Sequence, residues 1–108
     1  MINTENNNII FGEQLTIVKF TTTFCGPCKM IDPILKQLEE EYTDKGVIIN
    51  NCDAQINTEL TKKFGVRSVP TMIFFKDGEE IDKVTGLVAK NVLAEKIEAG
   101  LKYSKDDF

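Results

Sequence analysis

Histidine is absent from this sequence of 108 residues, and tryptophan is absent as well. Without an imidazole, the chain cannot supply a Ser-His or Cys-His catalytic pair or a histidine metal ligand. Positive charge is also in short supply, because 13 basic residues stand against 17 acidic ones and the formal net charge is −4. No basic excess is available to neutralise phosphates, which argues against a nucleic-acid-binding protein.

Cysteine is scarce, and its three copies fall at positions 25, 28 and 52. An odd count leaves one thiol over, which argues against a disulfide-stapled secreted scaffold. Long apolar runs are missing too, since no stretch approaches the roughly 20 residues that span a bilayer. Residues 1–14 lack the basic region and apolar run of a signal peptide. We therefore expect a cytoplasmic protein that binds no membrane and whose thiols are kept reduced.

The apolar content fits one folded unit. Hydrophobic residues make up 42% of the chain, enough for one core, and the length fits a single domain over 1–108. The polar composition of residues 1–8 predicts a loose N-terminal arm, and the charged residues 104–108 predict a frayed tail.

Hydrophobic patterning between these ends predicts alternating strands and helices. The expected strands are Leu15–Thr21, Val47–Asn51, Thr71–Lys76 and Glu80–Thr85, the last two joined by an Asp77-Gly78 turn. The expected helices run from Pro27 to about Thr43 with Pro33 inside, over Thr58–Phe64, and through Val92, Leu93, Ile97 and Leu101. This order predicts an α/β fold with a mixed four- to five-stranded sheet and helices on both of its faces.

A Cys-Gly-Pro-Cys segment lies between the first strand and the first helix, at Cys25-Gly26-Pro27-Cys28. A helix start presents unpaired N–H groups and the positive end of the helix dipole, and both favour a thiolate over a thiol. The thiolate is the attacking species in disulfide exchange. Cys25 comes first, at the exposed end, so we expect it to be the nucleophile and Cys28 to resolve the mixed disulfide.

Two other roles for this cysteine pair are half of a zinc site and two inert core thiols. Structural zinc takes four ligands, whereas the chain has three Cys and no His. Turn-forming residues, rather than apolar ones, surround the pair. Redox chemistry is therefore the favoured interpretation.

Several separated motifs in a fixed order resemble the thioredoxin family. They are FCGPCKM at 24–30, Pro33, VRSVPT at 66–71, FFKDGEEI at 74–81 and Gly86. The resemblance covers about residues 15–103 and implies a thioredoxin-like fold. It further implies that Pro70 is cis beside the two cysteines and that backbone groups of Val69 pair with a bound substrate segment.

The resemblance also implies a small apolar substrate-binding surface around the cysteines. Its positions here are Phe24, Gly26, Pro27, Val69, Pro70 and Gly86. We expect a monomer that needs no metal or organic cofactor, because the two sulfurs carry the electrons. The implied partners are disulfide-containing substrate proteins and a thioredoxin-reductase-type electron donor.

Two residues beside the motif depart from the family. Phe24 stands where the family usually has Trp, so an indole N–H donor is lost while an apolar aromatic is kept. Lys19 stands where most members keep a buried acid. Its stem can pack inward while the ammonium reaches water or a carboxylate. Alternatively, it is a partly buried cation near Cys28 that stabilises thiolates or accepts a proton.

The N-terminal part departs as well, since only 24 residues precede Cys25. We expect a reduced or missing first helix, with a short edge strand at Asn8–Phe11. Cys52, at the end of the second predicted strand, is interpreted as a small buried hydrophobe. A regulatory or dimer-linking thiol is the alternative for Cys52.

The leading functional hypothesis is a small disulfide reductase, an enzyme working through Cys25 and Cys28. A thiol oxidase or isomerase is a second hypothesis within redox chemistry. A third, from a different class, is a non-catalytic binding subunit of a larger assembly that uses the same apolar surface. A zinc-bridged dimer through the two cysteines completes the alternatives.

Overall fold

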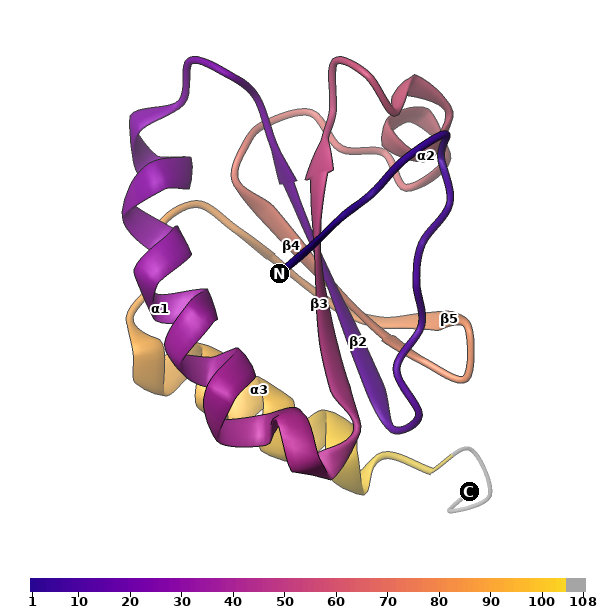
Figure 1. Ribbon diagram of the computed structural model, residues 1–108, viewed down its shortest axis with the longest axis vertical. Helices are drawn as coiled ribbons and strands as arrows, with labels where there is room; N and C mark the ends of the chain where they lie inside the picture. Colours follow the sequence, from indigo (N-terminus) through magenta and orange to yellow (C-terminus); the bar gives the residue numbers. More distant parts are fainter. Residues whose placement is uncertain (105–108) are drawn as a thin grey trace.

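Five strands form one mixed sheet in the computed structural model, which describes residues 1–104. The strands are β1 (Ile2–Asn3), β2 (Leu15–Thr21), β3 (Val47–Asp53), β4 (Thr71–Lys76) and β5 (Glu79–Thr85), arranged in the order β1-β3-β2-β4-β5 (Figure 1). The predicted boundaries of β2 and β4 are confirmed, and those of β3 and β5 differ by at most two residues. The predicted tail at 104–108 lies, beyond Ser104, outside the described residues.

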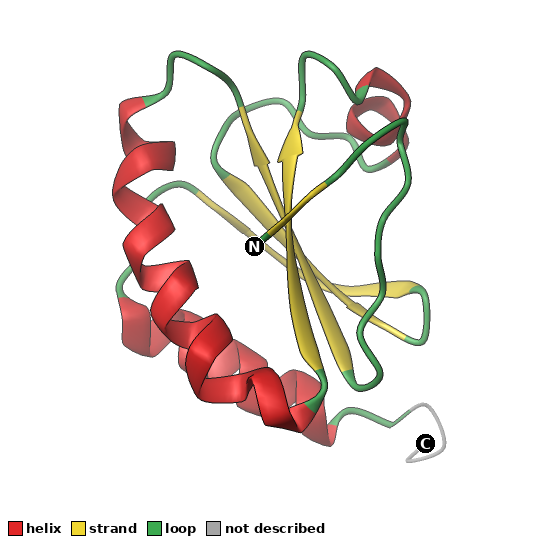
Figure 2. Ribbon diagram, in the orientation of Figure 1, coloured by secondary structure: helices red, strands yellow, loops and turns green. Residues whose placement is uncertain are grey.

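Helices cover both faces of this sheet, as the sequence predicted (Figure 2). The helical elements are α1 (Gly26–Tyr42), the short 3₁₀ turn η1 (Thr43–Lys45), α2 (Thr58–Lys63) and α3 (Lys90–Lys102). On one face α1 and α3 bury an apolar core with Leu15 and Ile17, while on the other Leu60 of α2 packs with Val18 and Phe20. No helix within residues 1–104 is both long and apolar enough to cross a membrane.

The sheet register brings three chain segments to one edge. β2 and β3 are parallel, with α1 crossing between them, whereas β4 is antiparallel to both β2 and β5. Thr71 pairs with Phe20 of β2 on one side and with Thr85 of β5 on the other. The end of β2, the start of β4 and the end of β5 therefore lie side by side, and the loops that leave them meet there.

The N-terminal segment corrects two expectations. The edge strand lies at Ile2–Asn3, parallel to β3, and not at Asn8–Phe11. The arm is also not loose: the Thr4 N–H donates to the Asn51 carbonyl at 2.9 Å. Asn50 holds the later part of this segment, because its side chain accepts a hydrogen bond from the Ile10 N–H and donates one to the Ile10 carbonyl. Asparagine side chains thus add to the apolar contacts that Met1, Ile9 and Phe11 make with the cores.

The predicted loss of the first helix is confirmed, since no helix precedes β2 in the described part of the chain. The segment from Thr4 to Gln14 instead runs along the β3 edge without regular structure beyond one isolated Glu5–Asn8 bridge. Although the N-terminal part is reduced, β2 and α1 are both formed at the predicted positions.

Candidate active site

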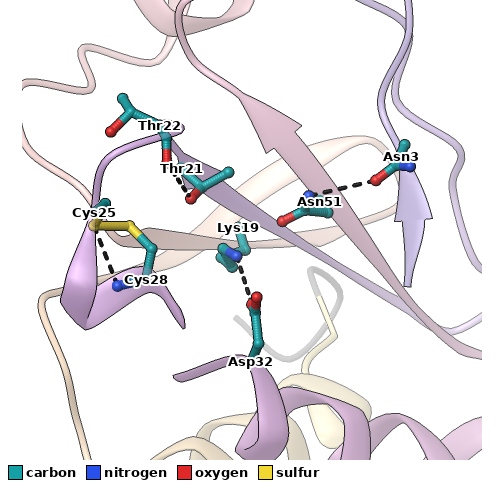
Figure 3. Close-up of polar contacts among 8 residues, drawn as sticks. All are labelled: Asn3, Lys19, Thr21, Thr22, Cys25, Cys28, Asp32 and Asn51. Atoms are coloured by element: carbon teal, nitrogen blue, oxygen red, sulfur yellow. Dashed lines mark hydrogen bonds and ion pairs between the residues drawn. A yellow bond between two sulfur atoms is a disulfide. The ribbon is translucent and has the colours of Figure 1, made fainter. Parts of the chain in front are cut away.

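Cys25 and Cys28 form a disulfide at the start of α1 (Figure 3), with their Cα atoms 5.3 Å apart. Cys25 is the N-cap residue of α1, and its Sγ accepts a hydrogen bond from the backbone N–H of Cys28 at 3.2 Å. Cys25 is 8% exposed and Cys28 1% exposed. The first cysteine is therefore the more accessible of two sulfurs that are both held by the helix start.

Local sequence explains why the chain turns here. β2 ends at Thr21, and Pro27 sits within the first helical positions, where its missing N–H costs nothing. The first turn of α1 carries no acidic residue. The positive end of the helix dipole therefore acts on Cys25 Sγ without a nearby carboxylate from that turn, an arrangement that favours the thiolate.

The edge of the sheet brings the other predicted positions close to the pair. The Val69-Pro70 peptide bond is cis, as the resemblance implied, and Pro70 directly precedes β4. Gly86 follows β5 with φ at 91°, a backbone conformation that favours glycine, and its N–H donates to the Pro70 carbonyl at 2.8 Å. The hydrogen bond ties the two loops together.

Exposure divides the six predicted surface positions. Phe24 is 95% exposed, with Gly26 and Pro27 exposed beside it. Val69 and Gly86 are half-buried, whereas Pro70 is buried. The exposed part of the predicted surface is therefore made mainly by Phe24, Gly26 and Pro27, and Phe24 has the most exposed side chain.

Lys19 lies within the protein, 1% exposed, and its ammonium reaches a carboxylate. Lys19 Nζ is 2.5 Å from Asp32 Oδ1 on α1 (Figure 3). Sequence reasoning missed Asp32. The available signal was its position four residues after Cys28, which places both side chains on one face of the helix.

Cys52 is fully buried and has no disulfide partner. Burial is the main cause that raises the pKa of its thiol from 9.0 to about 11. Its side chain packs in the core on the α2 face with Val18 and Phe20. Within residues 1–104, no three His, Cys, Asp or Glu side chains gather closely enough to hold a metal ion.

Comparison with known proteins gives consistent results. The family model described as Thioredoxin matches residues 2–99. Thioredoxin from Staphylococcus saprophyticus is 47% identical over 96 residues, 89% of each chain. The M-type chloroplastic thioredoxin of Pisum sativum is 44% identical over 91 residues, 83% of this chain and 52% of its own length.

Solved structures agree with these sequence matches. A mutant thioredoxin from Halobacterium salinarum superposes with a TM-score of 0.77 at 31% identity, covering 84% of this chain and 78% of its own. Fasciola hepatica thioredoxin gives a TM-score of 0.73 at 33% identity and covers 81% of each chain. Sequence, fold and the Cys25–Cys28 disulfide thus agree that the chain belongs to the thioredoxin family of protein thiol–disulfide oxidoreductases.

Proposed function

We propose that the protein reduces disulfides of substrate proteins through a Cys25–Cys28 dithiol cycle. The Cys25 thiolate attacks a substrate disulfide, forming a mixed disulfide and releasing one substrate sulfur as a thiolate. Cys28 loses its proton and attacks Cys25 Sγ, which closes the intramolecular disulfide and releases the second substrate sulfur. Two electrons pass to the substrate, and the protein is left in the oxidised form.

One observation carries the assignment of roles. Cys25 is the more exposed of the two cysteines, and its Sγ accepts a hydrogen bond from the N–H of Cys28 at the helix start. A group that stabilises a thiolate there raises the thiolate fraction of the attacking cysteine. Cys28 is sealed from solvent, which suits a residue that meets only Cys25.

The substrate surface of this proposal comprises Phe24, Gly26, Pro27, Val69 and Gly86, with Pro70 beneath it. Phe24 offers an apolar contact next to the nucleophile because nearly all of its side chain is exposed. Val69 lies where β4 begins, at the edge that carries Cys25, so an extended substrate segment can pair with its backbone. Pro70, being buried, supports this loop rather than contacting substrate.

A monomer in the cytoplasm, recharged by a thioredoxin-reductase-type electron donor, completes the proposal. The two sulfurs store the electron pair, so the cycle needs no metal or organic cofactor. Reduced thiols persist in that compartment, and the unpaired thiol of Cys52 is compatible with it.

Reduction of insulin by dithiothreitol tests this function through the turbidity of the released chains. The native protein should accelerate the reaction, and the Cys25→Ser variant should not. Cys52→Ala serves as the matched control and should remain active, since Cys52 is buried outside the pair. No acceleration by the native protein would support a binding subunit instead.

Equilibration of the Cys25–Cys28 disulfide with glutathione separates a reductase from an oxidase or isomerase. A reductase holds its disulfide stable against the cytosolic glutathione poise, so the oxidised form should dominate under mildly reducing mixtures. A pair that glutathione reduces readily would assign an oxidant.

A further inference from the structure

In the reduced protein, the thiol proton of Cys28 cannot pass directly to water. Its thiol must become a thiolate before it attacks Cys25, yet the residue is 1% exposed. The chain has no histidine to accept that proton. A buried thiol of this kind needs a protein group nearby that can take the proton and communicate with solvent.

Asp32 meets both requirements. It lies four residues after Cys28 on α1, and side chains at this spacing are neighbours, with Cβ atoms about 5–6 Å apart. Its side chain is 32% exposed, so the carboxylate borders both the interior and the solvent. The other acidic residues of α1 are Glu39, Glu40 and Glu41, about two turns further along the helix.

Lys19 holds this carboxylate in place. Lys19 lies two residues after Ile17 and four after Leu15 on β2, so all three side chains point to the sheet face that α1 covers. The ion pair, with Nζ 2.5 Å from Asp32 Oδ1, connects β2 to α1. A buried ammonium is costly to leave unpaired, so the ion pair fixes the rotamer of the carboxylate.

Asn51 adds a polar atom beside this pair. Its register partner on β2 is Lys19, and neighbouring strands lie about 4.8 Å apart. The Asn51 side-chain oxygen is buried and has no hydrogen-bond partner among the described residues, while its nitrogen donates to Asn3 (Figure 3). The open acceptor thus lies on the strand next to Lys19, whose ammonium has three N–H donors.

We propose that Asp32 is the proton acceptor for Cys28 in the resolving step and that Lys19 is its positioning residue. This inference rests on the proposed function. The proton moves from Cys28 Sγ to the Asp32 carboxylate, directly or through one water, as Cys28 Sγ bonds to Cys25 Sγ. The bond from Cys25 to the substrate sulfur breaks, and the departing thiolate takes up a proton from solvent while Asp32 returns its own to solvent.

Few other ionisable groups lie beside this ion pair in the sheet register. Lys19 enters from β2 and Asp32 from α1, while the neighbours of Lys19 in register on β3 and β4 are Asn51 and Met72, neither of which titrates. The two thiols lie nearby, and Asp53 follows Asn51 by two residues on the same face of β3. The pH dependence of the resolving step therefore reports on Cys28, Asp32 and Lys19.

Dithiobis(nitrobenzoate) separates the two chemical steps in a stopped-flow experiment on the reduced protein. Attack by Cys25 releases a first nitrothiobenzoate, and resolution by Cys28 releases a second. Asp32→Asn should leave the first release unchanged and slow the second at least about 10-fold at pH 7. The second rate should recover as the pH rises far enough for Cys28 to ionise without a proton acceptor.

Three further variants make the test specific. Glu40→Gln, an exposed acid on the same helix, should leave both rates unchanged. Lys19→Met should slow only the second release, and Lys19→Met combined with Asp32→Asn should equal Asp32→Asn alone, because Lys19 acts through Asp32. The double variant also removes the unpaired buried charge. Cys52 is buried in the folded chain, so nitrothiobenzoate released by its reaction identifies any variant that has unfolded.

A second release that is unchanged in Asp32→Asn at pH 7, or slowed equally at every pH, would overturn the assignment of Asp32. Additive slowing in the double variant would overturn the positioning role of Lys19. A native protein that shows the first release but never the second would instead contradict the proposed dithiol cycle. The two levels of the account therefore fail in different ways.

Discussion

The backbone N–H of Cys28 donates a hydrogen bond to Cys25 Sγ over 3.2 Å. The same N–H belongs to the first turn of α1, so it carries the partial positive charge of the helix start. In the reduced protein this donor would face the attacking thiolate. Helix geometry thus supplies the electrostatic help that an imidazole or a metal ion gives in other thiol chemistry, which is how a chain without histidine can perform this reaction.

Replacement of Phe24 by Ala should weaken substrate binding without weakening the fold. The side chain is 95% exposed, so we expect the free energy of unfolding to change by less than about 0.5 kcal/mol. The KM for insulin should rise several-fold while the rate with dithiobis(nitrobenzoate), which is too small to need the surface, stays constant. Steady-state kinetics with both substrates measure the difference.

A matched control for that variant is Ile56→Ala. Ile56 is 71% exposed and lies between β3 and α2, outside the six positions of the predicted substrate surface. Its KM for insulin should equal the native value. Equal KM values for Phe24→Ala and the native protein would remove Phe24 from the binding surface.

Stability at alkaline pH should depend on Cys52. The folded-state pKa of about 11 lies above the ordinary value of 9.0, so folding favours the neutral thiol. The stabilisation is complete below pH 9 and is lost as the pH rises toward 11. Relative to Cys52→Ala, the oxidised native protein should lose roughly 1 kcal/mol of unfolding free energy between pH 8 and pH 10.

Urea titrations followed by circular dichroism provide this measurement, since the chain has no tryptophan to serve as a fluorescent probe. Tyr42 also has a raised pKa, chiefly because its hydroxyl donates to Glu98. That contribution is common to both proteins and cancels in the comparison. Parallel stability curves for the native protein and Cys52→Ala between pH 8 and pH 10 would show that Cys52 is not buried as described.

Replacement by alanine should destabilise the protein at Gly12 but not at Gly26. A Cβ at Gly12 would lie 2.7 Å from the Leu15 carbonyl oxygen and 2.8 Å from that of Gly46, and neither backbone atom can move freely. Gly12→Ala should therefore cost about 1–3 kcal/mol of unfolding free energy. A Cβ at Gly26 meets nothing within 4 Å, so Gly26→Ala should stay within about 0.5 kcal/mol.

Urea midpoints of the two variants, measured side by side, decide this point. Because Gly26 also lies on the proposed substrate surface, Gly26→Ala should raise the KM for insulin even though the fold is unchanged. Native-like stability of Gly12→Ala would mean that the turn before β2 is looser than the structure shows.

Sequence patterning located the elements that are built from apolar periodicity. β2 and β4 were predicted to the residue because both are buried on two faces and read as continuous apolar runs. The edge strand at Ile2–Asn3 was misplaced, since two residues leave no periodic signal and asparagine side chains hold the segment. Apolar patterning has no way to detect an attachment of that kind.

The candidate site was partly visible in the same way. The two cysteines come from a short motif and the cis form of Pro70 from the family resemblance, so both were expected without coordinates. The partner of Lys19 was not, because an ion pair between a strand and the following helix depends on how far α1 is rotated about its axis. Only the packed structure fixes that rotation and brings Asp32 to the ammonium.

The central claim is that Cys25 attacks the substrate and Cys28 releases it. Incubation of reduced Cys28→Ser with a disulfide-containing protein, followed by mass spectrometry of the non-reduced complex, tests it most directly. The account predicts a stable mixed disulfide through Cys25 in Cys28→Ser and no such adduct in Cys25→Ser. A mixed disulfide captured through Cys28 in Cys25→Ser, with none through Cys25 in Cys28→Ser, would contradict it.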